Sequence, residues 1–314
     1  MMWRALLAVL AGVAAPALAE STPLFEDDTP LRGVLTFEAF DGPATLDLDG
    51  RTFPLKLEQR GKSRREHCRF PPLRLNFKRK TLSGTVLEGQ NKLKLVTHCS
   101  GSDHKRGNLA AEYLIYRMYN QLTEQSFRVR WIDMTYVRNG RPTQTGAFLI
   151  EHKRSVAKRL GIQAMKTGRV KRSQLQPDAS ARLNLFAYMV GNTDFSLLSG
   201  PPGDDCCHNV VPFQSGDEVI PIPYDFDATG LVNPGYAAPA EQLSIRKVTQ
   251  RLYRGFCIHD EALAGAKEQL AGKREALLNM VSAQPNLPDR KRKQTTRYLT
   301  GFFDRLERFN EPCR

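Results

Sequence analysis

This sequence of 314 residues lacks several features that would assign it to a common class of protein. After residue 19 no apolar run approaches the roughly 20 residues that a membrane-spanning helix needs, so we expect no transmembrane segment in the mature chain. There is no helix-turn-helix, zinc-finger or aromatic-studded RNA-binding pattern, which argues against nucleic acid as a partner. Internal repeats and low-complexity tracts are also lacking, and the composition is therefore that of ordinary globular domains.

Zinc-type C-x-x-C spacing is missing as well, although the chain has six cysteines. Histidine stands beside cysteine three times, at His67, His98 and His208, which keeps metal binding open as an alternative. An even number of cysteines is nevertheless typical of disulfides in an oxidising compartment. We predict a disulfide between Cys68 and Cys99, with the other four pairing among themselves: Cys206, Cys207, Cys257 and Cys313.

The first 19 residues have the pattern of a secretory signal peptide. Arg4 supplies the positive charge, residues 5–15 are apolar, and residues 17–19 form a small-x-small cleavage site. Glu20, and not a cysteine, follows that site, so we expect no lipoprotein anchor. The pattern predicts a periplasmic or secreted protein.

Positive charge dominates the chain, since 46 Lys and Arg outnumber 33 Asp and Glu and give the full sequence a formal charge of +13, or +12 without Arg4. Much of it lies in the runs 62–65, 78–80, 169–172 and 289–293. Such scattered runs are typical of solvated faces. They can also attract an anionic nucleotide, polymer, membrane surface or acidic protein.

Alternation of apolar and polar residues predicts a strand-rich unit over residues 20–150. We expect one prominent helix over residues 108–122, and strands over 33–37, 44–48, 53–57, 73–78, 92–96, 127–137 and 146–151. The remainder, 151–314, favours helices over 155–160, 180–190, 240–253, 260–283 and 289–309. This change near residue 151 predicts an α+β protein of two lobes, a strand-rich N-lobe and a helical C-lobe, with ligands between them.

An acid, an amide and two further acids follow one another where elements are predicted to end. Asp194 comes after a helix that stops at Gly191, and Asn209 lies 15 residues later. Asp225 and Asp227 follow an apolar run. Phosphoryl transfer uses one carboxylate on the attacking hydroxyl and an amide with another carboxylate on Mg²⁺, so this order suggests that chemistry. Turn-forming or helix-capping Asx residues are the structural alternative.

A phosphate-binding lysine would complete such a site. Lys92 and Lys94 share one face of a predicted strand that precedes the helix bearing Glu112, so either could pair with that glutamate. We favour Lys94, and Arg74 and Lys78 of the neighbouring strand remain open alternatives. Lysines at alternate positions are equally typical of the wet face of a sheet. A candidate phosphate-covering loop runs from Gly61 to Ser63.

The order of these motifs resembles the CotH-like family of secreted atypical protein kinases, over about residues 55–235. The resemblance rests on the run 60–63, the basic strand 73–78, the Lys92–Leu95 strand, the helix with Glu112, the strand 146–151, the Asn192-Thr193-Asp194 motif, Asn209 and Asp225-Phe226-Asp227.

That resemblance implies an atypical protein-kinase-like fold and a particular set of roles. Asp194 would be the catalytic base, and Glu151 would lie at the hinge near the adenine. Asn209 and Asp225 would bind Mg²⁺, with help from Asp227. The sequence therefore predicts an exported phosphotransferase that uses ATP and Mg²⁺ on a hydroxyl of an acidic, co-exported protein. The alternatives are nucleotidyl transfer on the same fold, and a pseudokinase or other non-catalytic module that binds an anionic envelope polymer.

Overall fold

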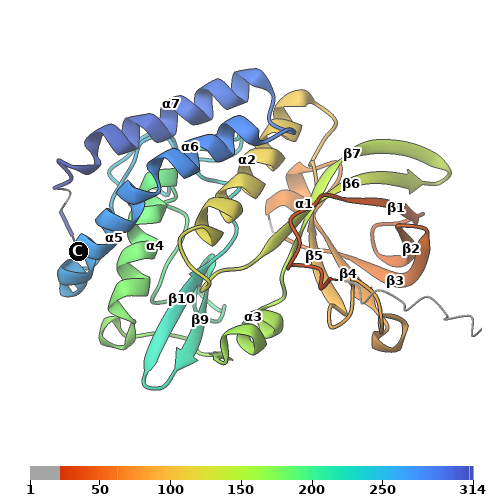
Figure 1. Ribbon diagram of the computed structural model, residues 1–314, viewed down its shortest axis with the longest axis horizontal. Coiled ribbons are helices and arrows are strands. Elements are labelled where there is room, and N and C mark those ends of the chain that lie inside the picture. Colours follow the sequence, from red (N-terminus) through yellow and green to blue (C-terminus); the bar gives the residue numbers. More distant parts are fainter. Residues whose placement is uncertain (1–21, 62, 311, 314) are drawn as a thin grey trace, which may run out of the picture.

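The computed structural model describes residues 22–61, 63–310 and 312–313, and the predicted signal peptide lies outside this range. Strands gather at one end of the molecule and most helices at the other (Figure 1). No helix in the described part of the chain is long and apolar enough to span a membrane.

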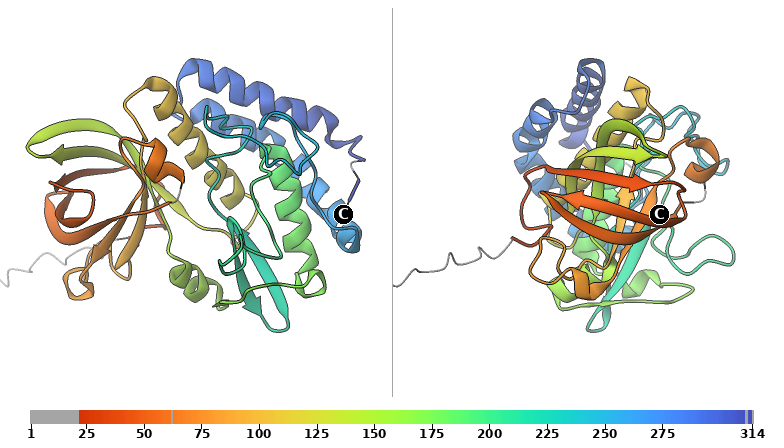
Figure 2. Two further views of the ribbon diagram at one scale, coloured as in Figure 1. Left: turned by 180° about the vertical axis from the view of Figure 1, so that it is seen from behind. Right: turned by 90° about the vertical axis from the view of Figure 1, so that its right-hand side faces the viewer.

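Seven strands of the first 150 residues close into a barrel in the order β1-β2-β3-β4-β5-β7-β6. Their bounds are Leu31–Phe37, Gly42–Leu48, Arg51–Gln59, Leu73–Phe77, Lys92–Val96, Val129–Arg138 and Arg141–Ile150 for β1 to β7. Burial alternates along them, and the inward residues make one apolar core that includes Leu35, Leu57 and Leu149. The right-hand view of Figure 2 looks onto this barrel, with the helices behind it.

The prediction of a two-lobed atypical protein-kinase-like fold is wrong, because the strands form a closed, mixed barrel. Closure comes from the parallel pairing of β1 with β6, which runs from Leu31 opposite Ile132 to Phe37 opposite Arg138. A parallel pair between strands so distant in sequence leaves no local pattern, so alternation alone could not foresee it. Because the two end strands of the sheet, β1 and β6, pair with each other, the barrel has no unpaired edge strand.

The part after residue 151 is not simply a helical lobe either. It contains a three-stranded sheet of β8 (Gln163–Ala164), β9 (Val210–Ser215) and β10 (Glu218–Pro223). The helix predicted over 240–253 is absent, and that segment consists of turns and bends. There the side-chain oxygen of Gln250 accepts hydrogen bonds from the backbone N–H groups of Arg246 and Lys247, and these bonds take the place of helical backbone hydrogen bonds.

The remaining helices pack around α2 (Asp103–Asn120) and α4 (Pro177–Val190). Figure 1 labels α1 (Ser63–His67), α3 (Lys153–Leu160), α5 (Asp260–Gly272), α6 (Arg274–Ala283) and α7 (Asp289–Leu306), and short 3₁₀ turns lie at Arg79–Thr81, Arg172–Gln174 and Cys257–His259. The single helix predicted over 260–283 is therefore two, since the chain breaks at Lys273. The core of this part continues onto the barrel, where Tyr113 and Tyr116 of α2 contact Phe148 of β7.

The cysteine pairing follows the prediction. Cys68 bonds to Cys99, Cys206 to Cys207, and Cys257 to Cys313. The first of these ties α1 to the chain just after β5. The only His, Cys, Asp or Glu group with metal-like proximity among the described residues is Cys257, Asp260 and Cys313, and its two sulfurs are joined to each other.

Gly146→Ala tests the packing of the barrel wall against α2. A Cβ at Gly146 would lie 2.1 Å from Cζ2 of Trp131, a buried ring whose N–H is held by Asp133. We expect a loss of about 1–3 kcal/mol in the free energy of unfolding, since the ring has no room to move. Gly101→Ala is the control, because nothing lies within 4 Å of its Cβ position. Equal urea midpoints for the two variants would contradict this packing.

Candidate functional site

Asp194 lies in a tight turn directly after α4. The helix ends at Gly191 in the left-handed conformation (φ +67°), and the side chain of Asn192 then accepts the backbone N–H of Asp194 at 3.0 Å. This turn leaves the Asp194 side chain 51% exposed. The predicted carboxylate is therefore held by the backbone at the surface and is accessible to a substrate.

The β9–β10 hairpin brings Asn209 and Asp225 to one place. Asn209 immediately precedes β9, and its carbonyl accepts the backbone N–H of Tyr224, just after β10, at 3.0 Å. The Asn209 amide nitrogen donates to the backbone carbonyl of Asp194 at 2.7 Å and to its carboxylate at 3.0 Å. Both Asn209 and Asp225 have positive φ, at 52° and 63°, a costly conformation typical of functional loops.

Asp225 and Asp227 are fixed by α2 and by the segment that follows them. The Tyr116 hydroxyl accepts the backbone N–H of Asp225 at 2.8 Å, and the buried Phe226 packs on the same tyrosine ring. Tyr236 donates to the Asp227 carboxylate at 2.6 Å. Burial and the charge of Asp225 raise the pKa of Asp227 to about 6, against the opposing effect of Arg64. Asp194 also raises this pKa, so the acids form one electrostatic cluster.

Glu112 is paired with Arg64 of α1, and not with a lysine. An Arg64 N–H donates to the buried carboxylate at 3.1 Å, another donates to the backbone carbonyl of Thr97 at 3.0 Å, and its Nε lies 3.8 Å from Asp227. Burial raises the pKa of Glu112 to about 8, although Arg64 opposes the shift. The prediction that Lys94 or Lys92 makes this pair is wrong. In the sequence, the basic segment 62–65 was the feature that could have drawn attention to Arg64.

Lys94 lies instead beside the residue that precedes Asp225. Its ammonium is 4.4 Å from the ring centroid of Tyr224. Burial lowers the pKa of Lys94 to about 7, Arg60 and Arg74 lower it further, and Asp225 opposes them. Lys94 is thus a half-buried amine beside the loop that carries Asp225, and its role as the phosphate-binding lysine stays a prediction.

Lys92 and Arg74 lie further from the acids. Lys92 is exposed and lines a separate basic groove with Lys80 and Lys158. Arg74 is opposite Lys94 in the β4–β5 register and forms a half-exposed ion pair with Glu58 at 3.4 Å. Their assignment as cofactor-binding residues stays a prediction.

The predicted phosphate-covering loop leads into α1. Gly61 is exposed with φ +82°, and Ser63 begins the helix that carries Arg64. Lys62 and the side chain of Ser63 lie outside the described residues. A role of this loop in covering phosphates stays a prediction.

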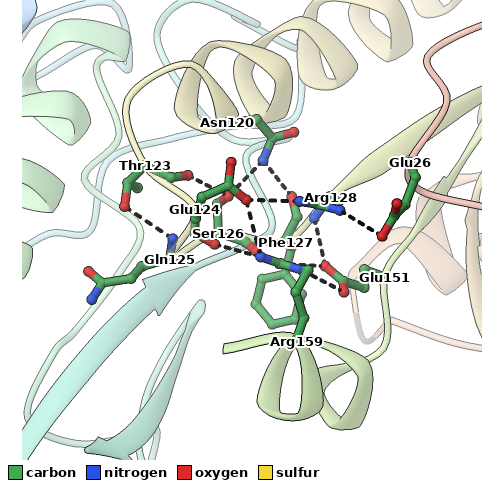
Figure 3. Close-up of polar contacts among 10 residues, drawn as sticks. All are labelled: Glu26, Asn120, Thr123, Glu124, Gln125, Ser126, Phe127, Arg128, Glu151 and Arg159. Atoms are coloured by element: carbon green, nitrogen blue, oxygen red, sulfur yellow. Dashed lines mark hydrogen bonds and ion pairs between the residues drawn. The ribbon is translucent and has the colours of Figure 1, made fainter. Parts of the chain in front are cut away.

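The Glu151 carboxylate belongs to an ion-pair network at the end of β7 (Figure 3). Arg159 donates to both of its oxygens at 3.2 and 2.8 Å, and the backbone N–H of Arg128 donates at 3.1 Å. Arg159 also donates to the carbonyls of Glu124 and Ser126, which ties α3 to the start of β6. These hydrogen bonds engage the carboxylate in holding the chain, and the backbone N–H of Glu151 donates to the carbonyl of Arg128 at 2.9 Å. A position of Glu151 near the adenine stays a prediction.

A cavity of about 620 Å³ opens beside Tyr224. Its walls come from α3, β8 and β9, and they combine apolar residues with the cations Lys153, Arg154 and Lys166. The apolar members include Ala157, Ile162, Met165 and Val211. The cavity has the size and mixed lining of a small-molecule site, next to the loop that carries Asp225.

His208 lies within the site, although the sequence suggested for it only metal binding beside Cys207. Its Nε2 is 2.7 Å from Asp194 Oδ1, and the hydrogen bond and charge of Asp194 raise the pKa of His208. The residue stands directly before Asn209. Its position beside the amide was the only available sequence clue.

The sequence matches no family model, and no curated protein matches it. The resemblance to CotH-like kinases stays a prediction, and the site is interpreted from its geometry.

Arg64→Met tests whether the Arg64–Glu112 pair holds the site together. Removing Arg64 leaves the buried Glu112 carboxyl and the Thr97 carbonyl without their hydrogen-bond donor, so we expect a loss of about 1–3 kcal/mol in the free energy of unfolding. Adding Glu112→Gln should restore much of it. The control is Arg274→Met, whose ion pair with Asp304 is exposed and should contribute less than about 1 kcal/mol. Urea unfolding measures all variants, and additive losses in the double variant would contradict the pairing.

Proposed function

We propose that the protein is an exported phosphotransferase that uses ATP and Mg²⁺ to phosphorylate a hydroxyl of a secreted or periplasmic protein. The observation that carries the proposal is the convergence of Asp194, Asn209, Asp225 and Asp227 from three separate loop positions into one cluster beside Lys94. Residues that only cap local turns need not converge in this way.

The donor atoms of the cluster suit Mg²⁺. Asn209 uses its amide nitrogen on Asp194, which leaves its side-chain oxygen available, and Asp225 adds a carboxylate. Hard oxygen donors of this kind are the ligands that Mg²⁺ prefers. Burial, and after it the negative charge of Asp225, raises the pKa of Asp227, and a cation between the two carboxylates would relieve their repulsion. Bound Mg²⁺ would neutralise the charge of the phosphates.

Asp194 is the residue we assign to the acceptor. Its carboxylate is half-exposed, and Asn209 and His208 hold it in one orientation. A carboxylate oriented in this way can position an attacking hydroxyl and accept its proton. Because His208 contacts the same Asp194 carboxylate that Asn209 holds, it is a positioning residue for Asp194.

The nucleotide would lie in the 620 Å³ cavity, with its phosphates toward Asp225. Apolar walls suit a purine base, and Tyr224 connects the cavity to the acids. Lys94, above the Tyr224 ring, would donate to a phosphate. An acidic protein is the acceptor we favour, since the formal charge of +13 favours its encounter.

Asp194→Asn and Asp225→Ala separate the two roles of the acids. Asp194 acts mainly in the transition state, so Asp194→Asn should leave ATP–Mg²⁺ affinity nearly unchanged and lower transfer by about a hundredfold or more. Asp225→Ala should weaken nucleotide binding as well as transfer. For both variants, calorimetry measures the affinity for ATP–Mg²⁺. The rate of phosphate transfer to an acidic protein such as casein and the melting temperature are measured as well.

Neither variant should melt far below the wild type, because both carboxylates are at least partly exposed. If both melt early and the wild type shows no thermal shift with ATP–Mg²⁺, the acids are structural and the proposed function is wrong. Binding of ATP–Mg²⁺ with transfer of the nucleotidyl group, seen by mass, would replace phosphorylation with nucleotidyl transfer.

Lys94→Met tests the proposed phosphate contact. Loss of a charge-assisted hydrogen bond costs about 1.5–3 kcal/mol, so ATP–Mg²⁺ affinity should fall by about tenfold to a hundredfold. The melting temperature should not fall, because burial already disfavours the charged amine, whose pKa is about 7. Lys92→Met is the matched control on the same face of β5 and should change neither quantity. Equal losses of affinity in both variants would contradict the assignment.

A further inference from the structure

A second cavity, of about 650 Å³, lies between α7, the segment after Asp227 and the end of α4, and we call it the α7 cavity. Four basic residues line it: Arg251, Lys291, Arg297 and Arg305. No Asp or Glu is among the described residues of its lining. Four other cavities of 560–800 Å³ in the described part of the chain each include at least one acid. The α7 cavity therefore has four basic residues and no acid in its described lining to offset them.

Neutral groups hold two of these cations in place without cancelling their charge. Arg251 donates to the carbonyls of Met189 and Tyr298 at 3.2 and 2.6 Å and stacks on the Tyr298 ring at 3.8 Å. Lys291 is buried and donates to Asn108 at 3.2 Å and to the carbonyl of Val232. The geometry is fixed before any ligand arrives, which reduces the entropic cost of binding.

Burial acts on two of these cations, and the charge of Arg305 acts on Arg251. Burial lowers the pKa of Arg251, and Arg305 lowers it further, while burial lowers the pKa of Lys291 to about 8. Like charges that converge in a partly dehydrated space are costly unless an anion compensates them. Arg297 and Arg305 are exposed at the mouth of the cavity, where such an anion would enter.

The polar lining indicates what kind of anion fits. Side-chain amides come from Asn233, Gln250 and Gln294. Those of Asn233 and Gln294 can both donate to and accept from hydroxyl groups, whereas the Gln250 oxygen already accepts two backbone N–H groups and leaves its nitrogen to donate. Two aromatic rings line the cavity, but Arg251 covers one face of Tyr298, and Tyr188 is 8% exposed and packs against other aromatic rings. A flat base therefore has little surface to stack on. A hydroxyl-rich anion suits this lining better than a nucleotide does.

We propose that the α7 cavity binds an anionic saccharide, either a free sugar phosphate or a carboxylated polysaccharide segment. The site is separate from the acid cluster, although the two share a wall: the backbone N–H groups of Gly230 and Leu231 donate to Gly191 and Val190 at 2.9 and 3.0 Å, just before Asp194. The proposal does not depend on phosphotransfer.

Calorimetry of the exported chain tests the proposal with three probes, which are glucose 6-phosphate, tetragalacturonate and glucose. At least one charged probe should bind at least about tenfold more tightly than glucose. Tighter binding of glucose 6-phosphate would identify the ligand as a free sugar phosphate, and tighter binding of tetragalacturonate would identify it as a carboxylated polysaccharide segment. Asp225→Ala should bind it as the wild type does, which separates this site from the phosphotransfer site.

The double variant Arg297→Gln/Arg305→Gln should bind the tighter of the two charged probes at least about tenfold more weakly than the wild type does. Its matched control is Arg290→Gln/Arg308→Gln, which removes the same charge from exposed positions outside the cavity lining and should change affinity less than about twofold. Gln294→Leu is a second cavity variant, at an exposed position, and should also weaken binding. Affinity no better than that for glucose, or equal losses in the cavity and control pairs, overturns the proposal.

Discussion

The ion pair between Arg64 and Glu112 is the contact on which the arrangement of the acid cluster depends. Arg64 follows the third barrel strand, Glu112 lies on α2, and Asp227 lies beyond β10, so one guanidinium joins three distant segments. Both side chains of the pair are largely buried, and burial of either alone would be costly. The Cys68–Cys99 disulfide anchors the same short helix next to the end of β5. The barrel therefore does more than form a core, because it delivers a cation to the acids of the other part.

The loops of the acid cluster store conformational cost that the surrounding hydrogen bonds offset. Asn209 and Asp225 both have positive φ, and each is held by a defined partner, Tyr224 at the hairpin end and Tyr116 on α2. Such positions cost of order 1–3 kcal/mol each and persist where packing determines them. The fixed geometry leaves the carboxylates of Asp194 and Asp225 at least partly exposed, which a purely structural turn would not require.

Much of this arrangement was predictable from local pattern, and the rest depended on distant contacts. Alternation located β5 at Lys92–Val96, and a helix stop followed by Asp194 placed that acid in a turn. The parallel β1–β6 pairing joins strands about a hundred residues apart and leaves no local trace, so the closed barrel was missed. The choice between Arg64 and Lys94 for Glu112 was likewise set by where α1 is anchored. Glu151 was assigned to the hinge near the adenine by the resemblance alone, and its ion pair with Arg159 could not be recognised from the sequence.

The most direct test of the central claim is a crystal structure with a non-hydrolysable ATP analogue and Mg²⁺. The proposed function predicts a metal ion at about 2.1 Å from the side-chain oxygens of Asn209 and Asp225. It also predicts the base in the cavity beside Tyr224 and a phosphate within hydrogen-bond distance of Lys94. A nucleotide bound elsewhere, or no metal at these residues at saturating concentration, would contradict it.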